Sequence, residues 1–121
     1  MGEPAQHHSI NYIEFSTTDI ERTKSFYSGV FGWEFQDWGP DYVGLCRENT
    51  GIDGAFRKRT EAGSPGTEAP LIVLYSRDLK ATEAAVIAAG GSIVVPTFEF
   101  PGGRRFHFSD GTGNVLAVWS E

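Results

Sequence analysis

The sequence contains only one cysteine, Cys46, among its 121 residues. A single cysteine cannot form an intramolecular disulfide, and it cannot build a cysteine-rich metal cluster within one chain. Isolated cysteines are commonly buried and inert, so we interpret Cys46 as a small apolar residue within a strand. The stability of this chain must therefore come from its hydrophobic core.

Long apolar runs and an excess of basic residues are also missing. The longest apolar stretches, such as 71–75 and 115–119, have about five residues, whereas a membrane helix needs roughly 20. The segment 1–9 lacks the basic start and apolar core of a secretion signal, so we expect a cytoplasmic protein. The net charge of -6 is opposite to the basic surface that nucleic acid selects. We therefore expect neither a membrane nor a nucleic acid as a partner.

The first half of the chain predicts the order strand, helix, strand, strand, strand. Residues 10–15 favour a strand, and either Thr18 or Asp19 could then cap a helix. We expect this helix to begin at Ile20 and to end at Gly32. Three short strands separated by turn signals are expected to follow, over residues 33–38, 42–48 and 52–58.

The second half repeats this order after residues 60–70, which have the composition of a linker. A strand, a helix and three strands are expected there, over residues 71–76, 79–89, 92–97, 104–109 and 114–119. At a constant offset of 59 residues, the cap, the first core residue and the terminating glycine coincide: Asp19 with Asp78, Ile20 with Leu79, and Gly32 with Gly91. We predict one α+β domain of two βαβββ modules, over about 10–59 and 71–120. Two unrelated βα units in one α+β domain are the alternative.

Three motifs resemble those of the vicinal oxygen chelate superfamily, which includes glyoxalase I, bleomycin resistance proteins, fosfomycin resistance enzymes and extradiol dioxygenases. The motifs are Asp19 through Phe26-Tyr27 to Val30-Phe31-Gly32-Trp33, then Asp110-Gly111-Thr112-Gly113-Asn114, and Ala88-Ala89-Gly90-Gly91 before Ile93. The second motif is similar to the family turn DPxGN, although Gly111 stands where proline is usual. The resemblance covers nearly the whole chain. It implies a single-domain member whose curved mixed sheets carry their helices on the convex side and surround a concave pocket.

The resemblance also implies where a metal would be held in members that are enzymes. Such members use three or four His, Glu or Gln side chains from equivalent strands of the two modules. Three of these positions are occupied by Tyr12, Leu71 and Ala117, and the fourth, on the strand near Asp53, cannot be aligned. We therefore predict no metal and no other cofactor. A divalent metal held by rewired ligands such as Glu14 and His107 is the alternative.

Strand alternation then predicts which side chains face the pocket. If Tyr12 points inward, then Glu14 shares its face, and the equivalent positions of the second module are also largely apolar. On the strand 104–109, either His107 or its neighbours Phe106 and Phe108 point inward, and the sequence leaves this open. The predicted ligand-binding residues, which include a hairpin rim and one possible proton-transfer group, are Tyr12, Glu14, Trp38, Tyr75, His107 and Trp119.

Two arginines follow a glycine-bearing stretch near the end of the second half. Arg104 and Arg105 come directly after Pro101-Gly102-Gly103. We expect both guanidinium groups to be solvent-exposed, and a mobile loop that closes over an anionic ligand is the alternative.

These observations leave three functions open. The first is a glyoxalase-like or bleomycin-resistance-like protein that binds a small, partly aromatic or cationic molecule in a metal-free aromatic pocket. The second is a lyase, isomerase or epimerase with rewired metal ligands, or with Glu14 and His107 as acid and base, but no residue is assigned as catalytic. The third is a dimeric interaction module with a degenerate pocket. A homodimer is expected in each case, because the open sheet edges need covering.

Overall fold

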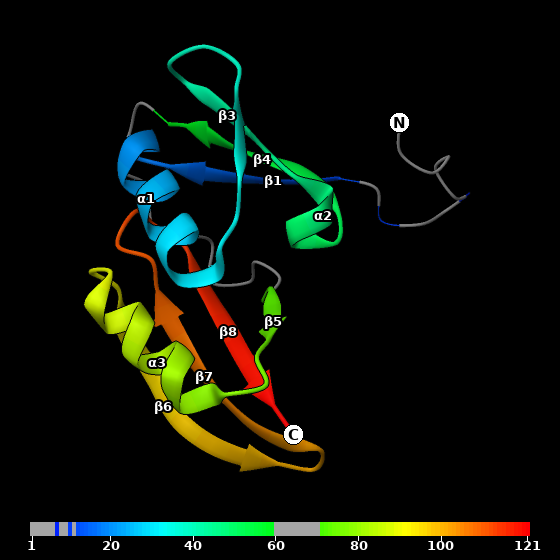
Figure 1. Ribbon diagram of the computed structural model, residues 1–121, viewed down its shortest axis with the longest axis vertical. Coiled ribbons are helices and arrows are strands. Elements are labelled where there is room, and N and C mark those ends of the chain that lie inside the picture. Colours follow the sequence, from blue (N-terminus) through cyan, green and yellow to red (C-terminus); the bar gives the residue numbers. More distant parts are fainter. Residues whose placement is uncertain (1–6, 8–9, 11, 60–70) are drawn as a thin grey trace.

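The computed structural model describes residues 7, 10, 12–59 and 71–121. The described residues form an α+β fold with three helices and eight strands in two four-stranded mixed sheets (Figure 1). The elements are β1 (Tyr12–Thr17), α1 (Ile20–Phe31), β2 (Phe35–Asp37), β3 (Tyr42–Leu45), α2 (Arg47–Thr50), β4 (Asp53–Lys58), β5 (Val73–Tyr75), α3 (Leu79–Ala88), β6 (Ser92–Phe100), β7 (Gly103–Ser109) and β8 (Val115–Ser120). The expected linker, 60–70, lies outside the described residues.

The two sheets have the same topology. The first has the strand order β1-β4-β3-β2, and the second has the order β5-β8-β7-β6. In each sheet the first strand of the half pairs in parallel with the last, and the other neighbours are antiparallel. The predicted order of one strand, a helix and three strands is therefore present twice.

Both long helices begin where the sequence predicts. Asp19 caps α1, because its carboxylate accepts a hydrogen bond from the backbone N–H of Arg22 at 3.0 Å. Asp78 caps α3 in the same way, with the backbone N–H of Ala81 at 3.1 Å. Of the two caps considered for the first helix, the aspartate is therefore the correct one. Gly32 ends α1 in the left-handed conformation with φ of 71°.

The end of α3 differs from the prediction. The left-handed residue after α3 is Gly90, with φ of 95°, and not Gly91. Gly91 meets a different requirement, because a Cβ atom there would lie 2.8 Å from Cε1 of Phe26 on α1. The offset of 59 residues therefore holds for the start of the helix but not for its terminating glycine.

A short helix replaces part of a predicted strand in the first half. The strand expected over 42–48 ends at Leu45, and α2 forms a single turn directly after it. Cys46 is half-buried at the start of this turn rather than inside a strand, and its carbonyl accepts the N–H of Asn49 at 2.9 Å. Gly51 ends the turn with φ of 84°.

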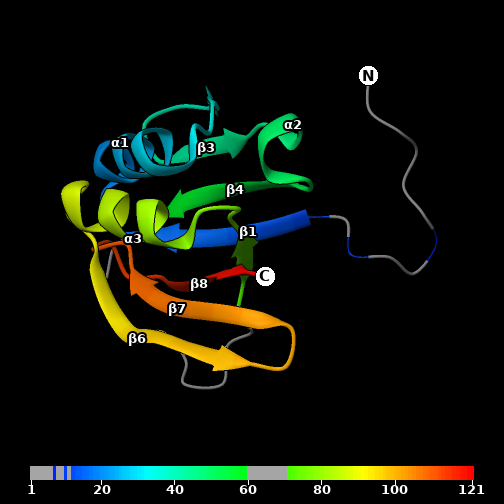
Figure 2. The same ribbon diagram turned by 60° about the horizontal axis from the view of Figure 1, so that its bottom comes forward.

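One hydrophobic core joins the two halves. Helices α1 and α3 lie next to each other in both views (Figures 1 and 2), and they contact each other. Phe26 of α1 stacks on Phe108 of β7, with ring centroids 5.9 Å apart. Tyr27 of α1 stacks on Trp33 at 4.9 Å and reaches Phe56 of β4 at 5.2 Å. No helix in the described part of the chain is long and apolar enough to cross a membrane.

Candidate functional site

Burial along β7 shows which of its side chains point away from the core. Phe106 and Phe108 are fully buried against the helices, whereas Arg105 and His107 are only half-buried. Because side chains alternate along a strand, Arg105 and His107 lie on the opposite face of the second sheet. The question left open by the sequence is therefore resolved in favour of His107 on the face away from α3, which we call the pocket face.

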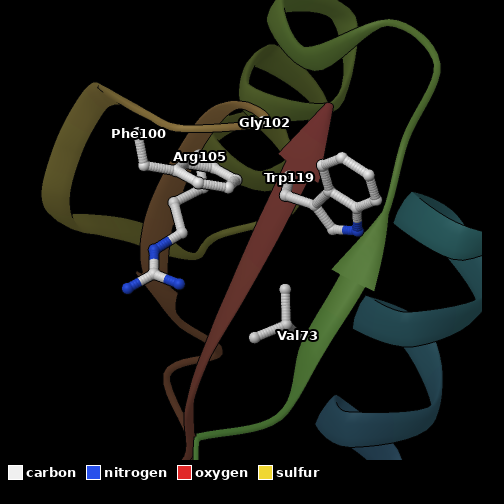
Figure 3. A pocket seen from close by; sticks show the side chains of 5 residues that line it. All are labelled: Val73, Phe100, Gly102, Arg105 and Trp119. Carbon is white, nitrogen blue, oxygen red and sulfur yellow. The ribbon is translucent and has the colours of Figure 1, made fainter. Parts of the chain in front are cut away.

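A cavity of about 360 Å³ lies on the pocket face of the second sheet. Figure 3 shows the residues that line it. The walls come from the four strands of this sheet and the β6–β7 turn: Val73, Phe100, Gly102, Arg105 and Trp119. This volume lies near the lower end of the range for small-molecule sites, which is roughly 300–1,000 Å³. The cavity can therefore hold a molecule of about one ring system.

The arginine of this cavity belongs to a strand and not to a mobile loop. The β6–β7 turn is short, because β6 continues to Phe100 and β7 already begins at Gly103. A Cβ atom at Gly103 would collide with the backbone oxygen of Ser120, so glycine permits the close approach of β8. Arg105 therefore lies within the strand expected over 104–109. The expectation of solvent exposure holds for Arg104 but is wrong for Arg105, which is half-buried, and the alternative of a loop that carries both guanidinium groups does not apply.

Aromatic rings hold the Arg105 side chain in place. Its guanidinium carbon lies 5.2 Å from the ring centroid of Phe98 and 5.6 Å from that of Phe100. Such stacking of a guanidinium on aromatic faces is favourable, and here it involves two rings from the same strand. Trp119 closes the other side of the cavity, with its ring 6.4 Å from that of Phe100.

Tyr75 lies beside the cavity at the edge strand β5. Its ring meets Trp119 edge to face at 5.1 Å, and its hydroxyl donates a hydrogen bond to Oε1 of Glu121 at 2.5 Å. The hydrogen bond to Glu121 raises the pKa of Tyr75, so this phenol is a neutral donor near pH 7. The tyrosine therefore supports Trp119 from the side.

His107 lies farther along the same face. Its ring centroid is 5.9 Å from that of Phe98, and its Nε2 atom is buried without a hydrogen-bond partner among the described residues. Burial lowers the pKa of His107, and the positive charge of Arg105 lowers the pKa further. The imidazole is therefore neutral near pH 7.

The predicted residues of the first half form a separate polar group on the first sheet. The hydroxyls of Tyr12 and Tyr42 are 2.6 Å apart, and Tyr42 donates to Oε2 of Glu14 at 3.0 Å. Arg57 Nε donates to the other oxygen of Glu14 at 3.4 Å. The hydrogen bond to Tyr12 is the largest cause that raises the pKa of Tyr42, followed by burial and Glu14. The negative charge of Glu14 is thus already compensated within the protein.

Trp38 extends the first sheet's exposed face. Its side chain is 65% exposed, and its backbone N–H donates to the carbonyl of Tyr42 across the hairpin at 3.0 Å. A Cβ atom at Gly44 would lie 3.1 Å from Trp38 Nε1, so the glycine leaves room for the indole. Trp38 is therefore positioned on the hairpin between β2 and β3, as the sequence predicts, but it does not line the cavity of the second sheet.

The six predicted ligand-binding residues consequently fall into two groups. Tyr12 and Glu14 belong to the first sheet and Trp38 to its β2–β3 turn, whereas Tyr75, His107 and Trp119 belong to the second sheet. Only Trp119 of these six lines the cavity. Sequence reasoning missed Phe100 as a wall, and it did not name Arg105 as a ligand-binding residue although it placed this arginine in the strand 104–109. The alternation Arg105, His107 against Phe106, Phe108 was the signal that could have found the arginine.

The strand register identifies the fourth position at which the resemblance implies a metal ligand. Glu14 pairs with Ala55 in the first sheet, and Val73 pairs with Ala117 at the equivalent place in the second. Ala55 is therefore the counterpart of Ala117, and the four positions are Tyr12, Ala55, Leu71 and Ala117. Leucine and alanine side chains have no lone pair to donate, so these residues do not fit the metal site.

Rewired ligands are not supported by the contacts either. Glu14 contacts Tyr42 and Arg57 on the first sheet, whereas His107 packs near Phe98 on the second. Within residues 12–59 and 71–121, no group of three His, Cys, Asp or Glu side chains lies close enough to hold a metal ion. An acid–base pair of Glu14 and His107 likewise has no direct contact to support it.

Comparison with known proteins identifies relatives of this chain. The family model "Glyoxalase/Bleomycin resistance protein/Dioxygenase superfamily" matches residues 9–118. A "Glyoxylase-like domain-containing protein" of Didymella fabae is 31% identical over 129 residues, which cover 93% of each chain. "Putative glyoxylase CFP32" of Mycobacterium tuberculosis is 27% identical over 115 residues, but this chain spans only 44% of its length. The crystal structure of a glyoxalase-related enzyme from Fulvimarina pelagi is similar with a TM-score of 0.76, at 19% identity, over 95% of this chain and 89% of that one.

Proposed function

Because this chain belongs to the Glyoxalase/Bleomycin resistance protein/Dioxygenase superfamily, we propose that it binds a small organic molecule in the cavity of its second sheet, without a metal ion. The observation that carries this proposal is the composition of the cavity wall. Val73, Phe100 and Trp119 supply apolar surface, and Arg105 adds one orienting polar group. A mainly apolar cavity with few polar groups is typical of small-molecule sites.

The residues at the family's metal positions support the metal-free part of the proposal. An apolar side chain occupies three of the four positions, and the fourth is Tyr12, whose hydroxyl already pairs with Tyr42. Chemistry that needs a bound divalent ion would have to use other residues. The contacts of Glu14 and His107 do not favour a shared acid–base role, so binding is the function that the geometry supports best.

A ligand screen tests the binding proposal directly. Compounds that bind only the native state raise its melting temperature, and Trp fluorescence reports occupation of the cavity. We expect hits from a library of single-ring compounds, and we expect Trp119→Ala to lose them. Trp38→Ala is the matched control, because Trp38 is on the other sheet and should leave binding unchanged. Val73→Gln, a change at a half-exposed wall residue, should weaken the same hits without unfolding the protein.

Two results would contradict the proposal. Hits that bind Trp119→Ala and Val73→Gln as tightly as the unchanged protein would place the ligand elsewhere. The metal-free part fails if the purified protein carries about one equivalent of a divalent metal and removal of that metal lowers the melting temperature.

We also expect a homodimer. Apolar side chains remain exposed on the faces and edges of both sheets, including Tyr12, Leu71, Val73 and Val115. Two of these residues, Tyr12 and Val73, lie on the edge strands β1 and β5, and an exposed edge strand is a ready partner for another chain. Light scattering coupled to gel filtration should give twice the monomer mass, and a monomer at micromolar concentration would contradict the expectation. A cytoplasmic location stays a prediction from the N-terminal composition.

A further inference from the structure

The cavity of the second sheet contains a positive charge, Arg105, that forms no ion pair with a carboxylate of the described residues. The described residues form ion pairs at Lys24, with Glu21 and Asp37, and at Arg57, with Glu14. Arg105 takes part in none of these ion pairs, although it is half-buried in the cavity wall. Half-buried charges usually have a partner, because burial weakens their hydration. A bound anion would supply that partner.

The way Arg105 is held leaves its hydrogen-bonding edge free. The two phenyl rings of Phe98 and Phe100 contact the guanidinium within 5.6 Å of its carbon. Nε is buried and has no hydrogen-bond partner among the described residues, and the terminal nitrogens form none of the hydrogen bonds found there. Figure 3 shows these terminal nitrogens at the end of the Arg105 side chain. A stacked guanidinium can still donate two parallel hydrogen bonds to a carboxylate.

The other charged groups described near the cavity do not cancel the positive charge of Arg105. Glu121 accepts the hydroxyl of Tyr75, and it forms no ion pair with Arg105. His107 is neutral near pH 7, because burial and Arg105 both lower its pKa. Arg104 faces the other side of β7 and is exposed. Glu14, the one acid among the predicted ligand-binding residues, lies on the other sheet and is paired with Arg57.

We propose that the ligand of this cavity is a small organic anion, a carboxylate attached to a flat apolar body of about one ring. The carboxylate accepts hydrogen bonds from the terminal nitrogens of Arg105, and the ring lies against Trp119, Phe100 and Val73. This inference rests on the proposed binding function, and it adds the charge and the shape of the ligand.

A matched set of three probes tests the inference. The anion 3-phenylpropionate, its neutral amide and the cation 3-phenylpropylammonium share a ring and a similar length, and they differ in charge. Backbone amide shifts in β5, β7 and β8, followed by NMR during titration, report binding at the cavity. We expect the anion to bind roughly 10- to 100-fold more tightly than the amide, as for hydrogen bonds to charged groups. The cation should bind most weakly.

Variants of the two adjacent arginines provide the control. Arg105→Gln should remove the preference for the anion, Arg105→Lys should keep part of it, and Arg104→Gln should keep all of it. Arg104→Gln removes the same charge from the opposite face, so it separates the local contact from the effect of net charge. The amide spectrum of each variant checks that the fold is intact.

The possible failures can be told apart. Equal binding of the three probes at the cavity, with loss in Trp119→Ala, would overturn the anion inference while the proposed function stands. Tighter binding of the cation, an anion preference that survives Arg105→Gln, or no binding of 3-phenylpropionate would overturn the inference as well. A failure of the proposed function would instead appear as an absence of any hit at the cavity in the wider library.

Discussion

At the scale of the single residue, the Asp110 carboxylate is a fully buried charge. Its two oxygens accept hydrogen bonds from the Tyr27 hydroxyl at 3.0 Å, from the backbone N–H of Thr112 at 2.8 Å, and from Asn114 through its backbone N–H at 3.1 Å and its side-chain amide at 3.0 Å. A buried carboxylate is tolerated when its hydrogen-bonding capacity is met in this way. The turn motif therefore has a structural role, which explains its aspartate and asparagine.

Removal of one of these donors should destabilise the fold. Tyr27→Phe leaves Oδ2 of Asp110 with one donor fewer in a site without water access, so we expect the free energy of unfolding to fall by about 1–3 kcal/mol. Tyr75→Phe is the control, because its hydroxyl contacts Glu121 at the surface and its loss should cost about 0.5 kcal/mol or less. Urea unfolding at pH 7 measures both changes. Equal losses in the two variants would show that the buried hydrogen bond of Tyr27 stabilises the fold no more than the exposed hydrogen bond of Tyr75.

His107 should give the protein a pH dependence in the mildly acidic range. Burial, and then Arg105, lower its pKa from the ordinary value of 6.5, so the folded state accepts a proton less readily than the unfolded chain. As the pH falls below about 6.5, the unfolded chain gains the proton first and the folded state loses stability. NMR titration of the imidazole should show the lowered pKa, and Arg105→Gln should raise it. A pKa of His107 at or above 6.5 would refute this assignment.

The helix starts are the best-defined features at the scale of the element. Asp19→Ala removes the acceptor for the N–H of Arg22, and we expect it to lower the free energy of unfolding by about 1 kcal/mol. Thr18→Ala is the matched control, because Thr18 is the neighbouring residue that the sequence also allows as the cap. Its side chain makes no hydrogen bond among the described residues, so the change should cost about 0.5 kcal/mol or less. Thermal unfolding of both variants decides between the two caps, and a larger loss in Thr18→Ala would reverse the assignment.

The elements that local patterns specify could be predicted from the sequence, and those that depend on packing could not. Strand alternation correctly placed Tyr12 and Glu14 on one exposed face of β1, opposite Phe15, which packs against the core, because period-two burial is a local property. The single turn of α2 was missed because four residues provide too short a pattern for helical periodicity.

The cavity could be predicted less well than the fold for the same reason. Pro101, Gly102 and Gly103 have the composition of a loop, which hid the extension of β6 to Phe100 and the start of β7 at Gly103. Gly103 is in fact required by the approach of Ser120 on β8, a contact between segments that are distant along the chain. Trp119 was predicted because its face follows directly from the strand alternation. Arg57 neutralises Glu14, the carboxylate that the sequence predicted as a ligand-binding residue. This ion pair also depends on the geometry between neighbouring strands.

At the scale of the whole molecule, the two halves repeat the same topology but share their stabilising contacts. The turn between β7 and β8 in the second half is hydrogen-bonded to the end of β1 in the first half. The side-chain amide of Asn114 donates to the carbonyl of Ser16 at 2.9 Å, and the N–H of Thr18 donates to the carbonyl of Thr112 at 3.4 Å. Phe26 and Phe108 complete this connection through the core. The two halves thus have the same topology, and both contribute to the contacts that stabilise the fold.

These shared contacts predict one cooperative unfolding transition. If neither sheet can open without losing the common core, the slowest-exchanging amides of β4 and β7 must report the same opening free energy. Native-state hydrogen exchange followed by NMR measures both sets in one sample. Tyr27→Phe, which weakens a contact between the halves, should lower the two values by equal amounts. If one sheet instead exchanged at a consistently lower free energy, or if Tyr27→Phe affected only the first half, the halves would be separate folding units and the core between them a docking contact.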